Sequence, residues 1–161
     1  MPSLANWVKL LHVGVAFWFV SGTVARNVAI RQATRSDELP VVSNLMQLAG
    51  RFEKLMVIPG SAAVLVAGLL TTWAQHRPWF QHGSYWLVTS VVVYVASFAL
   101  VPLVFLPRGR VFEGALEDAR IRGQVTPELS AAFRDRAVWA ARTTEVLVVA
   151  FIIALMVLKP F

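Results

Sequence analysis

The chain has 161 residues, of which 57% are hydrophobic and only 15% are charged. Soluble domains carry roughly 25% charged residues, so this composition favours a membrane protein. The net charge is +6. The chain has no cysteine, which excludes disulfides and thiolate metal sites. The basic residues gather in particular connecting segments and form no nucleic-acid-binding motif. We therefore expect the basic residues to face the headgroups of a lipid bilayer and to bind no nucleic acid.

Four stretches are long and apolar enough to cross a bilayer, which requires about 20 residues each. In chain order they run from about Trp7 to Ala25, Leu55 to Ala74, Tyr85 to Leu106 and Trp139 to Leu158. The first stretch could be a cleaved signal peptide, but only Lys9 stands at its start, so we expect a retained helix. The sequence thus predicts an all-α, integral membrane four-helix bundle that forms a single domain over residues 1–161.

Basic residues gather in the first and third connecting segments. The first contains Arg26, Arg31, Arg35, Arg51 and Lys54, and the third contains Arg108, Arg110, Arg120, Arg122, Arg134 and Arg136. The middle segment has only Arg77. The positive-inside rule therefore places the first and third segments in the cytoplasm of a bacterium, with both termini outside it and the spans in the inner membrane. An outer aromatic belt is expected from Trp7, Trp73, Trp79, Phe80, Tyr85 and Trp86.

Both cytoplasmic segments show helical signals. Thr126-Pro127-Glu128 predicts a helix start, and that helix could continue unbroken into the fourth span. Leu45, Leu48, Phe52 and Leu55 recur at helical spacing ahead of the second span. Pro59 and Pro102 allow kinks. The two halves follow the same order, which is compatible with a duplicated helical hairpin, although no sequence identity demonstrates it.

The three histidines are the candidate ligands for haem iron or a metal ion. His12 lies about 7 Å from the bilayer centre if each residue rises ~1.5 Å, and neutral imidazole binds haem iron or metals. The alternative is a neutral histidine hydrogen-bonded to a neighbouring helix. His76 and His82 fall on the same side of the membrane as His12, but their spacing matches no metal motif. We therefore predict no metal site.

Glu145 is the second candidate, because it lies inside the fourth span. Arg142, one turn earlier, or Arg26, at the end of the first span, could pair with it. A structural ion pair is favoured over a proton relay or a substrate gate.

Two features of the spans have packing explanations. Gly60, Ala63, Ala67 and Thr71 form a stripe of small residues on the second span, which favours close packing within the bundle over a dimer interface. Trp18, in the first span, could stack on a cofactor, but simple packing is more common for a lone tryptophan.

Three motifs resemble an uncharacterised bacterial membrane family, catalogued as domain of unknown function two-two-six-nine. They are Trp7-Val8-Lys9-Leu10-Leu11-His12 with Trp18 and Ser21-Gly22; Ile58-Pro59-Gly60 followed by Gly68-Leu69; and Leu155-Met156-Val157-Leu158-Lys159-Pro160. The resemblance covers nearly the whole chain. It implies four membrane helices and no established activity.

The opening is also similar to CopD-type copper-resistance proteins and HemJ-type protoporphyrinogen oxidases, which begin with a Lys-x-x-His helix followed by Trp and Gly. In the HemJ type the first-helix histidine is a haem ligand, so the resemblance implies this role for His12. A lysine of a later helix is also implicated there, whereas the third span here has neither Lys nor His. The resemblance thus leaves haem binding open, with His76 or His82 as the second ligand, and argues against porphyrin oxidation.

The sequence best predicts a non-catalytic membrane bundle that associates with itself or with a larger membrane assembly. The first alternative is a redox protein that binds haem b through His12. The second is a transporter of a small solute or of protons that uses Glu145.

Overall fold

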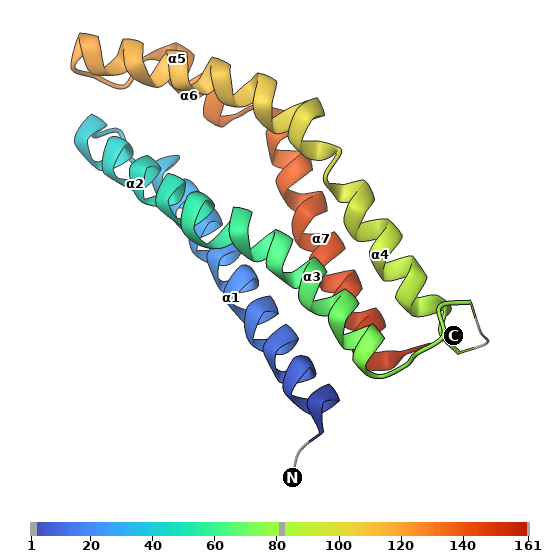
Figure 1. Cartoon of the computed structure of the whole chain (residues 1–161). Helices are drawn as coiled ribbons and strands as arrows, with labels where there is room; N and C mark the ends of the chain where they lie inside the picture. Colours follow the sequence, from blue (N-terminus) through green and yellow to red (C-terminus); the bar gives the residue numbers. More distant parts are fainter. Residues whose placement is uncertain (1–2, 81–82, 161) are drawn as a thin grey trace. The chain divides into compact units, whose positions relative to one another are not determined.

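The computed structural model describes residues 3–80 and 83–160 of the chain (Figure 1). Every regular element within these residues is helical. In this described part of the chain, four helical segments are long and apolar enough to cross a membrane: Leu4–Ala33, Leu39–Ala74, Tyr85–Arg122 and Pro127–Leu158. Each contains one of the four apolar stretches of the sequence and extends well beyond it at one end, and the first also begins three residues earlier. The predicted all-α membrane fold with four spans is therefore confirmed.

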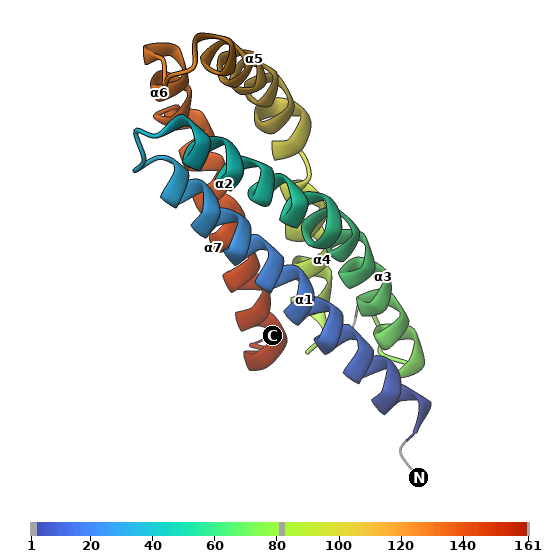
Figure 2. The same cartoon turned by 90° about the vertical axis from the view of Figure 1, so that its left-hand side faces the viewer.

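The chain divides into two compact units, and the first comprises residues 1–36 and 40–78. Its helix α1 (Leu4–Ala33) lies alongside a second helix built from α2 (Leu39–Phe52), η1 (Glu53–Val57) and α3 (Ile58–Ala74), as Figures 1 and 2 show. The two run antiparallel, because residues near the start of α1 lie against the end of α3. Ala29 and Ile30 of α1 pack on Ala49 and Met46 of α2. This unit is a helical hairpin that extends past the second span.

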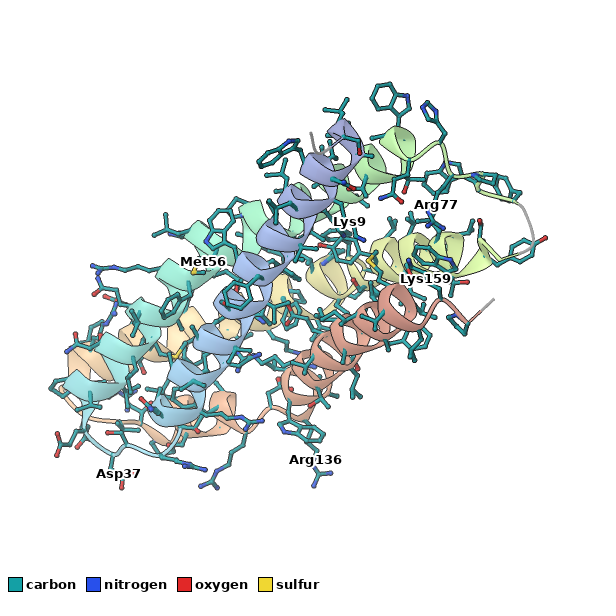
Figure 3. The ribbon with its side chains drawn as sticks, turned by 90° about the horizontal axis from the view of Figure 1, so that it is seen from below. Lys9, Asp37, Met56, Arg77, Arg136 and Lys159 are labelled. Carbon is teal, nitrogen blue, oxygen red and sulfur yellow. The ribbon has the colours of Figure 1, made fainter. Side chains whose placement is uncertain are left out.

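The second unit comprises residues 37–39 and 79–161. One arm contains α4 (Tyr85–Ser97), η2 (Val101–Phe105) and α5 (Leu106–Arg122), and the returning arm contains α6 (Pro127–Phe133) and α7 (Arg136–Leu158). Trp86 and Leu87 of α4 pack on Leu155 of α7, while Phe112 of α5 meets Phe133 of α6 edge to face. The second unit is therefore also an antiparallel hairpin. In Figure 3 Arg136 and Lys159 mark the two ends of α7.

The elements η1 and η2 are single turns of π-helix, and prolines accompany both of them. Pro59 follows η1 by two residues, and Pro102 lies within η2. Proline has no N–H to give to the carbonyl four residues earlier. At Pro102 that carbonyl belongs to Phe98, and it accepts the N–H of Val101 at 3.1 Å instead. The kinks expected at the two prolines thus appear as wider local turns.

The start of the last segment was predicted correctly, but its continuity was not. Thr126 caps α6, because its hydroxyl accepts the N–H of Leu129 at 3.2 Å. The helix then breaks at Arg134 and Asp135 and does not run unbroken into the fourth span. Asp135 has extended backbone angles, and its carboxylate accepts the N–H groups of Ala137 and Val138, so it caps α7 as a separate helix.

The residues expected in the outer aromatic belt differ in burial, and their level in a bilayer stays a prediction. Trp7, Trp73, Phe80 and Tyr85 are exposed. Trp86, in contrast, is only 6% exposed and belongs to the core of the second unit, where Trp79 packs against it. The indole of Trp86 donates to the carbonyl of Gly83, and the ammonium of Lys159 lies 5.8 Å from its ring centre. Trp86 therefore joins the two arms of its hairpin.

Candidate functional site

His12 lies on the face of α1 that packs against α3. A side-chain carbon added to Gly68 would come within 3.2 Å of the imidazole Cε1, so the ring rests directly on the backbone of α3 at this glycine. The Nδ1 atom is buried and has no hydrogen-bond partner among the described residues. His12 is thus a packed histidine with one buried, unpaired ring nitrogen among the described residues.

The other predicted histidine ligands do not join His12 within the described residues. His76 is exposed, has a positive φ of 49° and follows the end of α3. It lies eight residues beyond Gly68, which places it roughly 12 Å further along the helix axis. His82 lies outside the described residues. Among the described residues no second histidine lies beside His12, and haem ligation through His12, His76 or His82 stays a prediction.

Across residues 3–80 and 83–160, no group of three or more His, Asp or Glu side chains is placed to hold a metal ion.

The stripe of small residues on α3 faces α1. Gly60 lies against Phe19, where an added side-chain carbon would come within 3.2 Å of the Phe19 backbone. Ala67 is buried, and the Thr71 hydroxyl lies 3.4 Å from the carbonyl of Val8 while donating to its own helix. Gly22 of α1 meets Met56 in the same way. The stripe therefore packs within the hairpin, as expected.

Arg26 is the most buried cation of this hairpin, and its carboxylate partner was missed by the sequence reasoning. Its guanidinium donates to Glu53 of η1 over 2.6 Å, and the two side chains are 9% and 39% exposed. The sequence did offer one indication of this pair: Arg26 follows the first span and Glu53 precedes the second, so both lie on the same side of the expected bilayer. Arg142 and Glu145 each have an interaction partner. The pairing of Glu145 with Arg142 or Arg26, like the transport role of Glu145, stays a prediction.

The second hairpin has an ion pair at the corresponding position. Arg108, just after η2, donates to Asp135 at 2.7 Å. In both hairpins the arginine precedes its carboxylate by 27 residues, and the carboxylate stands at the start of the second span. This shared spacing supports the predicted duplication of a helical hairpin. The pairs differ in burial, because the Arg108 side chain is 52% exposed.

Residues 6–160 match the family described as "Predicted integral membrane protein (DUF2269)". The chain belongs to this family. The family resemblance expected from the motifs around His12, Pro59 and Lys159 is therefore confirmed, and DUF2269 membership agrees with the four candidate spans. The similarity to CopD-type and HemJ-type proteins stays a prediction. No curated protein and no solved structure matches the chain.

Proposed function

We propose that this chain is a non-catalytic membrane protein that associates with itself or with a larger membrane assembly. One observation supports it best. Gly14, Phe17 and Trp18 are exposed in the middle of α1, and an added side-chain carbon at Gly14 would meet no neighbouring helix within 4 Å. The missing side chain at Gly14 leaves a notch on this face of α1. The exposed Phe17 side chain lies one turn away from it.

Protein contact explains these residues better than lipid contact does. Tryptophan prefers the interface of a bilayer, whereas Trp18 lies near the middle of its span. Helices associate in membranes where small residues let another helix approach. Phe17 of a second chain could fill the notch at Gly14. In addition, only 11% to 22% of the most apolar part of each span is buried within the chain, which leaves ample surface for a partner.

Cysteine cross-linking in native membranes tests this proposal, because the chain has no cysteine of its own. Gly14→Cys should form a disulfide-linked dimer on oxidation, whereas Val66→Cys, on the exposed face of α3, should not. Gly14→Leu should reduce association by filling the notch, and Ala62→Leu serves as its matched control. A product of greater mass than the dimer would support a larger assembly. The proposal fails if Gly14→Cys and Phe17→Cys give no product and the protein is monomeric in mild detergent.

Haem b ligation through His12 is a second candidate, supported by the buried Nδ1, which has no hydrogen-bond partner among the described residues. We expect protein from haem-replete cells to show a sharp Soret band that His12→Ala abolishes, because the axial ligand is lost. His76→Ala or His82→Ala should alter the spectrum only if that histidine is the second ligand. Colourless protein would leave self-association as the remaining proposal.

A further inference from the structure

One face of α2 and η1 carries hydrogen-bond donors and no free carboxylate. Asn44, Gln47, Arg51 and Lys54 recur every three or four residues and are all exposed, so they are neighbours on the helix surface. The only acidic residue of the segment Leu39–Ala74 is Glu53, which Arg26 of α1 engages. Neither Arg51 nor Lys54 forms an ion pair within the described residues. This face is therefore suited to an anion.

The depth of these cations suggests which anion. The 20 residues 55–74 carry no charge and rise about 30 Å along the helix, which matches the thickness of the hydrocarbon core. Lys54 consequently stands at the boundary of the core, and Arg51 lies roughly 4.5 Å further out. Phospholipid phosphates occupy this level.

Exposed apolar side chains continue the same surface into the membrane. Leu55 is 66% exposed, and Ile58 and Val66 are similarly open. Acyl chains would cover these residues, whereas a free phosphate ion would not. The surface thus has a cationic end that matches an anionic headgroup and an apolar flank that matches acyl chains.

We propose that Arg51 and Lys54 bind the phosphate of an anionic phospholipid in the leaflet at this end of the second span, with Asn44 and Gln47 as further donors. The Arg26–Glu53 pair supports the site by holding the nearest carboxylate toward α1. Zwitterionic phospholipids carry the same phosphate with a compensating cation, so they bind more weakly. The inference is independent of self-association and of haem.

Native mass spectrometry of the full chain in mild detergent tests the site, with phosphatidylglycerol and phosphatidylcholine as probes. Wild-type protein should retain phosphatidylglycerol preferentially. The Arg51→Gln/Lys54→Gln variant should lose roughly tenfold in affinity for it, because two cations at the headgroup are removed. The matched control, Arg31→Gln/Arg35→Gln, removes the same charge from two other exposed residues of this hairpin and should bind as wild type does.

An equal loss in both double variants would show a general charge effect and overturn the site. Displacement of phosphatidylglycerol by millimolar inorganic phosphate would assign the surface to a soluble anion and overturn the lipid. Exchange of the cations, Arg51→Lys with Lys54→Arg, should preserve binding and shows that charge is what matters. If wild-type protein shows no preference for phosphatidylglycerol over phosphatidylcholine, the proposal fails whether or not the variants fold.

Discussion

At the scale of single residues, Arg26 and Arg108 hold carboxylates at nearly the same distance but in different surroundings. The Arg26 side chain is 9% exposed, whereas that of Arg108 is 52% exposed. Removing Glu53 takes away the carboxylate that faces the buried Arg26 guanidinium. Removing Arg108 leaves the Asp135 carboxylate with the N–H groups of Ala137 and Val138, which it still accepts. The two ion pairs should therefore contribute unequally to the stability of their hairpins.

Glu53→Gln should lower the free energy of unfolding by about 1.5–3 kcal/mol, because a charged hydrogen bond to a buried arginine is lost, whereas Arg108→Gln should change it by less than about 1 kcal/mol. Denaturant titration in mixed micelles measures both variants under the same conditions. Equal losses would contradict the difference in burial on which this prediction rests.

Gly22 marks a close contact between α1 and the opposite arm of its hairpin. An added side-chain carbon would overlap Cβ of Met56, and Cβ cannot rotate away. Gly22→Ala should therefore destabilise the protein by about 1–3 kcal/mol, because the helices must separate. Gly50→Ala, where the added carbon meets nothing within 4 Å, is the matched control and should be neutral or slightly stabilising.

The same titration distinguishes a Cβ overlap from general crowding. Met56→Ala keeps Cβ and should not rescue Gly22→Ala. Rescue by Met56→Ala would show that the outer atoms of Met56 cause the strain.

At the scale of elements, the break before α7 depends on Asp135. Its carboxylate both caps the helix and pairs with Arg108. Asp135→Asn should retain the cap and lose only an exposed ion pair, whereas Asp135→Ala should cost about 1 kcal/mol more. Unfolding of the two variants in the same micelles checks this order. The capping role is wrong if they are equally stable.

The spans could be predicted from sequence because charge is absent from long stretches, and the Thr126 cap could be predicted because its signal is local. Asp135 is also a residue type that favours helix N-caps. It was missed because the helix was expected to start at Thr126 and to continue through Asp135. The Arg26–Glu53 pair and the burial of Trp86 were not predictable in this way. Both depend on how two helices that are distant in the sequence align along their length. The composition of the spans does not determine this alignment.

At the scale of the whole molecule, two hairpins with an equivalent arginine–carboxylate pair account for the four spans. Each hairpin extends past the apolar stretch at the end where its basic residues gather. This asymmetry is the basis for expecting both extended ends on the cytoplasmic side and both termini on the other.

Labelling of single cysteines in intact cells tests the four-span account most directly. Arg77→Cys lies between the second and third spans, and Gln124→Cys lies between the third and fourth. An impermeant thiol reagent should label Arg77→Cys in intact cells and Gln124→Cys only after permeabilisation. Labelling of both residues from the same side would contradict the four-span topology.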